Sequence, residues 1–573
     1  MSISSVIKSI QDIMRKDAGV DGDAQRLGQM SWLLFLKVFD AQEEELEFEQ
    51  DDYRAPIPSH YLWRNWAADS QGITGDELLE FINDDLFPTL KNLTAPSDTN
   101  PRGFVVKEAF SDAFNYMKNG TLLRQIINKL NEIDFTDSKE RHLFGDIYEQ
   151  ILRDLQSAGN AGEFYTPRAV TRFIVNRLDP KLGEQIMDPA CGTGGFLACS
   201  FDHVKDNYVK SASDHQTLQQ QIHGVEKKQL PHLLCITNMM LHGIEVPVQI
   251  KHGNTLNKPL SSWDSNINVI ATNPPFGGTE EDGIEKNFPS DMQTRETADL
   301  FLQLIVEVLD RDGRAGVVLP DGTLFGEGVK SKIKEKLTDE CNLHTIVRLP
   351  NGVFNPYTGI KTNILFFTKG QPTQNIWVYE HPYPEGTKSY SKTKPMKFDE
   401  FQQEIEWWGD EATGFAERLE NQFAWKVDFQ AMKDDANMKA EPHRQKAIEF
   451  KQQEDLLKYD IASLKERRSK EQLDDKQLEH IEKEIKSLQK KAKKASESAK
   501  AEEKSASDIY YAIFNFDFKN PYQDEVASHD PEELLASYQQ QQQDIKALRD
   551  QLKGILGDAL SSTIQGKKQG GEQ

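Results

Sequence analysis

The sequence is poor in cysteine and has no long hydrophobic run. Its four cysteines (Cys191, Cys199, Cys235 and Cys341) form neither a CxxC pair nor a Cys/His ligand spacing, which argues against a zinc site and against disulfides. No apolar stretch has the length of a membrane-spanning helix, and the first ten residues lack the basic start of a secretory signal. We therefore expect a reduced, cytoplasmic protein that contacts no membrane and holds no metal.

Positive charge is also scarce. The 573 residues include 68 Lys and Arg against 92 Asp and Glu, which gives a net charge of -24 at pH 7. Cationic contacts to phosphate supply most of the non-specific affinity of DNA-binding proteins. An acidic chain of this kind that acts on DNA either gathers its basic residues on one face or leaves DNA holding to a separate subunit, and we favour the separate subunit.

Composition and periodicity divide the chain into regions. Residues 1–154 are predicted to form an all-helical N-terminal domain, with helical periodicity at residues 27–39, 76–90, 107–117 and 121–130. Residues 155–375 alternate short apolar runs with helices and turns, which predicts an α/β domain with a doubly wound, largely parallel sheet. Its seven expected strands lie at residues 185–187, 222–225, 248–251, 267–272, 315–319, 344–349 and 362–368.

The remaining third is predicted to be mainly helical. Residues 376–440 are a mixed connecting segment, and residues 441–573 are a helical, coiled-coil region for subunit contacts. Two heptad stretches in the charged insert 441–506 favour a helical hairpin or a stuttered coiled coil, with a solvated Lys/Glu helix as the alternative. A last helix is expected after Asp530-Pro531. Its apolar seam runs through Leu534, Tyr538, Gln541, Ile545, Leu548, Leu552 and Ile555.

The most informative motif is Asn273-Pro274-Pro275-Phe276. It follows the predicted strand 267–272, so it should lie at the carboxyl end of a strand, where open α/β sheets bind ligands. The Asn273 side-chain oxygen and the Pro274 carbonyl can accept hydrogen bonds from the two N–H groups of an exocyclic amino group. The two consecutive prolines fix the backbone that carries these acceptors. Phe276 offers a flat face for a base turned out of its helix. For the tetrapeptide alone, an ordinary turn is the alternative.

Three polar groups precede this motif at the ends of successive predicted strands. Asp188 opens the Gly-rich turn DPACGTGGF (188–196), which lacks the dinucleotide and P-loop patterns and suits an amino-acid moiety with ammonium and carboxylate groups. Glu226 closes the next strand and can accept both hydroxyls of a ribose. Asn254 follows the third strand and can read an adenine edge, although a turn residue is the commoner role of a lone Asn.

In this order, the motifs resemble those of N6-adenine DNA methyltransferases, and more narrowly those of the modification (methyltransferase) subunits of type I restriction–modification systems. The resemblance covers roughly residues 24–370. It rests on GEFYTP (162–167), DPACGTGGF and NPPF, and on the later blocks Asp299-Leu300-Phe301, GRAGVVLPDG (313–322) and LPNGVFNPYTGIKTNILFF (349–367).

This resemblance implies a seven-stranded methyltransferase fold that uses S-adenosyl-L-methionine (AdoMet). It also implies direct methyl transfer to N6 of an adenine flipped out of double-stranded DNA, without a covalent enzyme intermediate. Asn273, Pro274 and Phe276 would form the catalytic pocket. The cofactor-binding positions would be Phe164, Tyr165, Thr166, Pro167, Asp188, Cys191, Gly192, Thr193, Gly194, Gly195, Glu226 and Asn254.

The resemblance also implies partners. After residue 370 the chain has no stretch with the size and basic, aromatic texture of a target-recognition domain, and type I modification subunits leave recognition to a specificity subunit. We therefore expect a specificity subunit, a second copy of this chain and a restriction or translocase subunit as partners. Three alternatives stay open: a self-sufficient adenine methyltransferase that reads DNA through residues 370–517, a protein glutamine methyltransferase, and a non-catalytic subunit that binds AdoMet.

Overall fold

The computed structural model describes residues 3–135, 166–355, 358–391, 394–471 and 475–522, together with residue 549. Phe164 and Tyr165 lie outside the described residues, as do the residues of the predicted seam at 534–555. Among the described residues, no helix is both long enough and apolar enough to cross a membrane.

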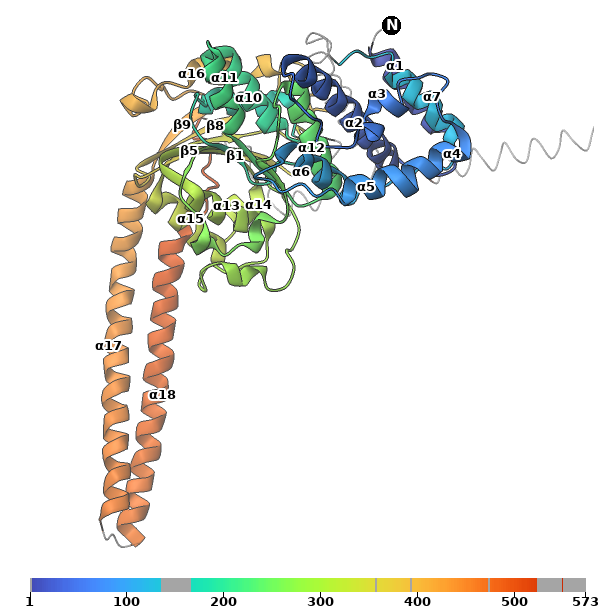
Figure 1. The fold of residues 1–573 in the computed structure, drawn as a ribbon. Helices are drawn as coiled ribbons and strands as arrows, with labels where there is room; N and C mark the ends of the chain where they lie inside the picture. Colours follow the sequence, from blue (N-terminus) through green and yellow to red (C-terminus); the bar gives the residue numbers. More distant parts are fainter. Residues whose placement is uncertain are drawn as a thin grey trace, which may run out of the picture. The chain divides into compact units, whose positions relative to one another are not determined.

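The N-terminal region is a set of helices around one long helix, α2. Four consecutive residues of α2, Trp32 to Phe35, are completely buried, so this helix is apolar on all sides where it passes through the core. The helical character predicted for the region is confirmed for residues 3–135. Its helices are α1 (Ile3–Met14), α2 (Asp23–Glu49), α3 (Trp63–Trp66), α4 (Gly75–Glu80), α5 (Phe87–Lys91), α6 (Pro101–Phe110) and α7 (Gly120–Leu130), with a π-helical segment (Phe81–Leu86) between α4 and α5 (Figure 1).

A nine-stranded sheet follows, with the order β3-β2-β1-β4-β5-β7-β6-β8-β9. All seven predicted strands are confirmed, and β8 and β9 extend the sheet into the segment predicted as a mixed connection. The strands are β1 (Ile186–Asp188), β2 (Ile222–Glu226), β3 (Ile250–His252), β4 (Ile267–Thr272), β5 (Leu309–Pro320), β6 (Cys341–Arg348), β7 (Thr362–Lys369), β8 (Asn375–Glu380) and β9 (Ala424–Asp428).

Strands β3, β2, β1, β4 and β5 are parallel to one another, and β7 is antiparallel to β5 and β6. The chain leaves β1 towards β2 and β3 and then returns to the other side of β1 with β4. This reversal confirms the doubly wound sheet. It also creates a switch point between β1 and β4, where such sheets bind ligands.

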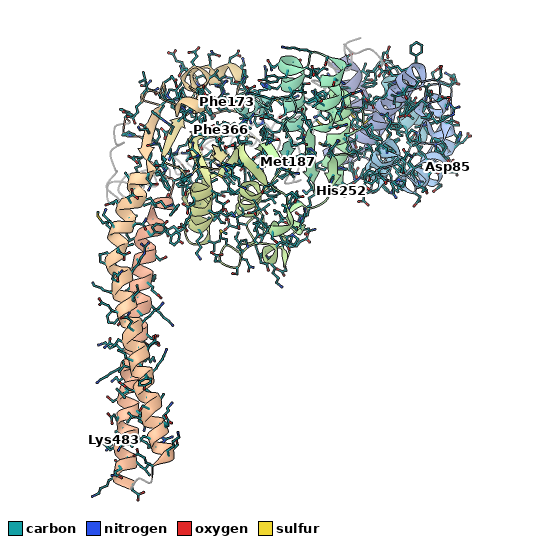
Figure 2. All side chains as sticks on the ribbon, turned by 60° about the vertical axis from the view of Figure 1, so that its left-hand side comes forward. Asp85, Phe173, Met187, His252, Phe366 and Lys483 are labelled. Atoms are coloured by element: carbon teal, nitrogen blue, oxygen red, sulfur yellow. The ribbon has the colours of Figure 1, made fainter. Side chains whose placement is uncertain are left out.

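Side chains of the central strands alternate between two cores, as the pleat of a strand requires. Along β7, Ile364 and Phe366 belong to the core shared with α9, α10 and α12, whereas Leu365 and Phe367 belong to the core of α13 and α15. The Phe366 ring lies edge-on to that of Phe173 of α9, with ring centroids 6.0 Å apart (Figure 2). The helices of this domain are α9 (Arg168–Leu178), α10 (Gly195–Tyr208), α11 (Ala212–Gln220), α12 (Gln229–His242), α13 (Thr297–Val308), α14 (Asp321–Phe325), α15 (Val329–Glu340) and α16 (Gln402–Trp407).

Strand β9 leads directly into a helical hairpin of α17 (Phe429–Lys470) and α18 (Asp475–Tyr511), which run side by side (Figure 1). The predicted hairpin is therefore confirmed. Its two heptad stretches form a small core of their own, made of Leu457, Ile461, Leu464, Ile481, Ile485, Leu488 and Ala492.

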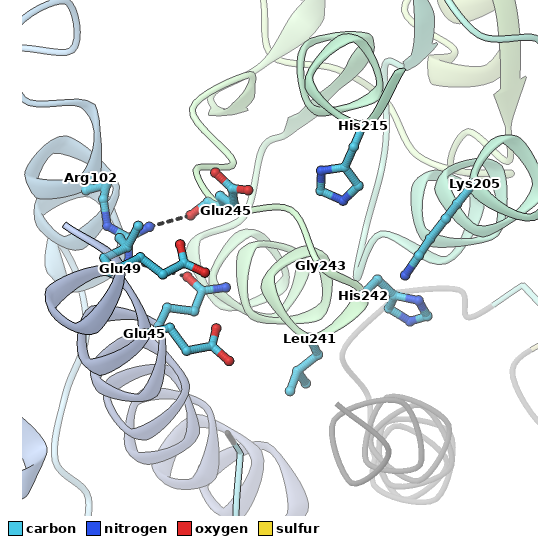
Figure 3. A pocket seen from close by; sticks show the side chains of 11 residues that line it. Glu45, Glu49, Arg102, Lys205, His215, Leu241, His242, Gly243 and Glu245 are labelled. Atoms are coloured by element: carbon cyan, nitrogen blue, oxygen red, sulfur yellow. Dashed lines mark hydrogen bonds between the residues drawn. The ribbon is translucent and has the colours of Figure 1, made fainter. Parts of the chain in front are cut away.

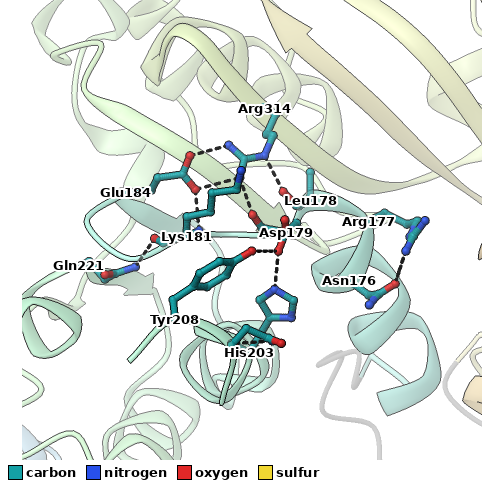
Figure 4. Close-up of polar contacts among 11 residues, drawn as sticks. Asn176, Arg177, Leu178, Asp179, Lys181, Glu184, His203, Tyr208, Gln221 and Arg314 are labelled. Carbon is teal, nitrogen blue, oxygen red and sulfur yellow. Dashed lines mark hydrogen bonds and ion pairs between the residues drawn. The ribbon is translucent and has the colours of Figure 1, made fainter. Parts of the chain in front are cut away.

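The carboxyl end of α9 is fixed by a polar network (Figure 4). Asp179 ends the helix in the left-handed conformation, with φ 44°, and its carboxylate accepts from Tyr208 Oη at 2.6 Å and pairs with His203. Arg314 of β5 donates to the carbonyls of Leu178 and Asp179 and forms two hydrogen bonds of 2.8 Å with Glu184. Carbonyls that the end of a helix leaves unpaired are thereby satisfied.

Candidate active site

The carboxyl ends of β1 to β4 meet at one edge of the sheet. Asp188 ends β1, Glu226 ends β2, and Asn254 and Asn273 follow the last residues of β3 and β4. Because these four strands are parallel neighbours, the four side chains predicted from the sequence are brought to the same edge, at the switch point.

Asp188 is almost completely buried, with 1% of its surface exposed. Its Oδ1 accepts hydrogen bonds from the hydroxyl of Thr272 at 2.6 Å and from the amide of Ala190 at 3.1 Å. Burial, with a smaller contribution from the nearby Glu226, raises the pKa of Asp188 to about 7, and these two hydrogen bonds oppose the rise. A cationic group placed beside this carboxylate would favour its ionised form.

The Gly-rich turn leaves room where ordinary side chains would stand. Gly192 and Gly194 adopt positive φ values of 53° and 81°. A Cβ on Gly194 would lie 2.7 Å from Cys235 Sγ, whereas a Cβ on Gly192 or Gly195 would meet no atom within 4 Å. Helix α10 begins at Gly195, and helix N-termini favour a carboxylate. A buried acid, an open glycine turn and a helix N-terminus fit the methionine part of AdoMet.

Glu226 links the second strand end to this turn. Its Oε2 accepts from the amide of Gly192 at 2.9 Å, and its Oε1 accepts from the amide of Lys228 at 2.8 Å. Carboxylate oxygens have further lone pairs, so Glu226 can still accept hydroxyl groups of a ribose.

Asn254 is held by two contacts. Its oxygen caps a short 3-10 turn by accepting from the amide of Leu256 at 3.0 Å, and its NH2 group donates to Glu280 Oε2 at 3.1 Å. Glu280 also pairs with Lys227 and accepts from Thr297. The amide of Asn254 is therefore fixed, and a contact between its oxygen and an adenine stays a prediction.

Asn273 lies directly after β4, and its side-chain amide is held by a residue that lies outside the sheet. Its Nδ2 donates to Thr166 Oγ1 at 2.8 Å. Its Oδ1 is buried and receives no hydrogen bond from the described part of the chain. The end of the amide that can accept from an amino group is therefore the end left unsatisfied.

Phe276 is 8% exposed, and its ring lies edge-on to Phe354 with centroids 5.4 Å apart. Phe354 belongs to the loop between β6 and β7, so two aromatic rings from distant parts of the chain meet next to the Asn273 turn.

The other predicted positions fall in several places. Cys191 is buried, and its Sγ lies 3.7 Å from Cys235 Sγ, so its thiol belongs to the packing of α12. The carbonyl of Thr193 accepts from Asn238. Pro167 precedes the first turn of α9. Thr272, Glu280 and Phe354 have site contacts but were not predicted individually, although Thr272 directly precedes the tetrapeptide and Phe354 lies within a matched block.

Two families match the chain. Residues 3–130 match the HsdM N-terminal domain, and residues 139–455 match N-6 DNA Methylase. The sequence is 70% identical to the type I restriction enzyme EcoEI methylase subunit of Escherichia coli, over 98% of this chain and 99% of that protein. It is 30% identical to the EcoKI methylase subunit of Escherichia coli K12, over 72% and 77% of the two chains.

Solved structures give the same result. A modification subunit from Vibrio vulnificus YJ016 is 45% identical, with a TM-score of 0.67 over 75% of this chain and 92% of that one. A chain from a study of complex assembly and conformational transition of the type I R-M system is 31% identical. Its TM-score is 0.70 over 97% of this chain and 98% of that one.

Proposed function

Because this chain belongs to the methylase subunits of type I restriction enzymes, within the N-6 DNA methylase family, we propose that the edge formed by β1 to β4 is its catalytic site. The reaction is AdoMet-dependent methylation of adenine N6 in DNA. One observation carries the assignment of the site: Asn273 presents a buried, unsatisfied acceptor at the end of β4, beside the buried acid and the open glycine turn after β1.

The amino group of adenine is a weak nucleophile because its lone pair is delocalised into the ring. Bound AdoMet supplies an electrophilic methyl group on a cationic sulfur. Asn273 Oδ1 and the Pro274 carbonyl would accept hydrogen bonds from the two N–H groups, which withdraws the lone pair from conjugation with the ring and localises it on N6. Transfer of that methyl group would form the N–C bond, break the S–C bond and leave N6 with one proton to release. The chain therefore contributes orientation and polarisation, and no strong base is required.

The remaining residues are assigned to binding. Asp188 and the turn from Gly192 to Gly195 hold the methionine part of AdoMet, and Glu226 holds the ribose. Phe276 packs against the flipped base. In this assignment the donor site lies beside β1 and β2 and the acceptor site lies after β4, and the strand order, which puts these strands on the two sides of the switch point, supports it.

Substitution of Asn273 tests this assignment. We expect Asn273→Ala to bind AdoMet with unchanged affinity, measured by calorimetry, and to lose methyl transfer, measured by mass spectrometry of nucleosides from treated DNA. Equal loss of both properties would reject a role for Asn273 in the chemical step.

We assign DNA recognition to a separate specificity subunit, joined by the C-terminal region 441–573, and we place the complex in the cytoplasm. The purified chain alone, incubated with AdoMet and unmethylated DNA, should give no N6-methyladenine, and addition of the specificity subunit should restore it. Product from the chain alone would instead support a self-sufficient methyltransferase.

Deletion of residues 530–573 should abolish complex formation and leave AdoMet binding intact.

A further inference from the structure

A threonine from outside the sheet holds the amide of Asn273. The hydrogen bond from Asn273 Nδ2 to Thr166 Oγ1 is 2.8 Å long and joins residues 107 positions apart. Thr166 stands immediately before Pro167, the residue that precedes α9, and α9 packs against β4 and β5. The tetrapeptide that carries the proposed chemistry therefore depends on a contact that its own four residues cannot make.

The orientation of this amide decides whether Asn273 can polarise an amino group. One end of the amide accepts hydrogen bonds and the other donates them. A half-turn of the amide would place its NH2 group against the N–H bonds of adenine, donor against donor. In the structure the donor end is bound to Thr166, so the acceptor end, Oδ1, faces away from Thr166 and is buried without a partner among residues 3–135, 166–355 and the later described ranges.

The unsatisfied Oδ1 is itself an argument for function. A buried acceptor without a partner costs about 1–3 kcal/mol, and among the described residues Asn273 Oδ1 is such an atom at the end of β4, the strand next to β1. The amino group of the substrate would supply the missing donor. The cost then falls on the free protein and is removed when the base enters, which favours binding of the flipped base in the reactive geometry.

We propose that Thr166 is a positioning residue for methyl transfer, whose hydroxyl holds the Asn273 amide so that Oδ1 is presented to the amino group of adenine. This inference rests on the proposed function, and it gives Thr166, which the sequence predicts as a cofactor-binding position, a second role towards the catalytic asparagine.

The support for Thr166 is rigid. A residue before proline is restricted to extended backbone, which limits the motion of Thr166. The carbonyl of Pro167 accepts from the amide of Val170 and from the hydroxyl of Thr171 in the first turn of α9. Farther along α9, Phe173 is completely buried in the core of the sheet. Thr166 is thus held by the docking of α9, as a positioning group requires.

The test compares threonine variants in the complex with the specificity subunit. Thr166→Val removes the hydroxyl and keeps the shape, whereas Thr166→Ser keeps the hydroxyl. Thr171→Val makes the same change in the first turn of α9, at a hydroxyl that donates to the Pro167 carbonyl and not to Asn273. Single-turnover methylation of unmethylated DNA is measured at saturating AdoMet, and AdoMet affinity is measured by calorimetry.

We expect Thr166→Val to slow methyl transfer about 10-fold to 100-fold, the loss typical of a misplaced reacting group, with AdoMet affinity unchanged within about twofold. Thr166→Ser should recover most of the rate, and Thr171→Val should resemble the unmodified complex. Thr166→Ala, which also lacks the hydroxyl and is smaller than Val, is run alongside and should be as slow as Thr166→Val.

Two results would overturn the inference. A normal rate in Thr166→Val and Thr166→Ala would show that the hydroxyl has no role in the reaction. Weaker AdoMet binding with a normal rate at saturation would show that Thr166 serves the cofactor. If Asn273→Ala is inactive in either case, the proposed function stands and only the role of Thr166 is lost.

Discussion

Burial holds the Asp188 carboxyl in its neutral form up to about pH 7, because its raised pKa reaches that value. The proton is bound in the folded protein and released in the unfolded chain between about pH 4 and pH 7. This acid therefore stabilises the fold most at low pH, and its contribution is lost as the pH rises through 7. An ammonium group of bound AdoMet would pair with the ionised carboxylate and lower its pKa again.

AdoMet binding should therefore depend on pH. We expect the affinity of the chain for AdoMet to rise about fivefold to tenfold between pH 6 and pH 7.5, as Asp188 ionises near its pKa of about 7. Calorimetric titrations at the two pH values measure the change. Asp188→Asn should bind weakly at both pH values, without the rise. The same rise in Asp188→Asn would assign the dependence to another group or to AdoMet itself.

At the scale of residues, the local sequence pattern predicted which polar side chains stand at the ends of individual strands. Asp188, Glu226, Asn254 and Asn273 follow apolar runs, and each run is confirmed as a strand. Contacts across the fold were not predictable. Thr166 contacts Asn273, which lies 107 positions later in the chain, and Glu280, in the loop after the tetrapeptide, contacts Asn254. A single sequence gives no indication of which residues contact each other when the contact depends on how α9 and the loops pack.

At the scale of elements, the network at the end of α9 makes Arg314 a clear target. Its side chain is 22% exposed and that of Glu184 is 25% exposed, so solvent screens the pair only in part. Arg314→Met would leave Glu184 and the carbonyls of Leu178 and Asp179 without their shared donor. We expect it to lower the free energy of unfolding by about 2 kcal/mol, between the values for exposed and buried pairs. Urea denaturation measures this loss.

The pH dependence of that loss has a defined sign. Arg314 is a cause of the lowered pKa of Glu184, so the stabilisation by the pair is present above the ordinary pKa of a glutamate and is lost as the pH falls below it. The difference in stability between Arg314→Met and the unmodified protein should therefore narrow in acid, where the hydrogen bonds from Arg314 to the two carbonyls remain. Arg311→Met, an exposed arginine of the same strand, is the control and should change stability by less than about 0.5 kcal/mol. Equal effects of the two substitutions would contradict the role of the network.

The element boundaries show where sequence patterns end. β8 and β9 were not predicted, because their residues fall in an aromatic segment where apolar and polar residues do not clearly alternate. β9 is also short and lies at the edge of the sheet. Helix α17 begins at Phe429, earlier than the predicted helical region at 441, because Asp428 caps its first turn by accepting from the amide of Ala431. It continues through Pro442, where a sequence pattern predicts a boundary.

At the scale of the whole molecule, the N-terminal helices are joined to the methyltransferase domain through α2, α6 and α12 (Figure 3). Arg102 of α6 donates to the carbonyl of Glu245, just after α12, at 2.8 Å. Gln42 of α2 and Gln229 of α12 add hydrogen bonds to carbonyls of the opposite domain. A pocket of about 260 Å³ lies along this contact, lined by residues that include Glu45, Glu49, Lys205 and His215.

Arg102 is the central group of this contact, because it also pairs with a completely buried acid. Its Nη2 lies 2.6 Å from Glu43 Oε1, whose side chain has no exposed surface, and its guanidinium lies over the ring of Phe39. Burial raises the pKa of Glu43, and Arg102 opposes this effect. Without Arg102, Glu43 would either stay charged without its partner in the interior or take up a proton.

We therefore expect Arg102→Met to lower the free energy of unfolding by about 3–5 kcal/mol, the usual cost of removing one partner of a buried ion pair. The added substitution Glu43→Gln removes the buried charge and should recover most of that loss. Arg15→Met breaks an exposed pair with Asp12, whose side chains are 57% and 51% exposed, and should have little effect.

Because Arg102 also bonds to Glu245, the N-terminal helices of Arg102→Met should unfold at lower urea than the AdoMet-binding domain, as two separate transitions. A single transition as stable as that of Arg15→Met would mean that the apolar faces of α2 and α12 hold the two domains together without the ion pair.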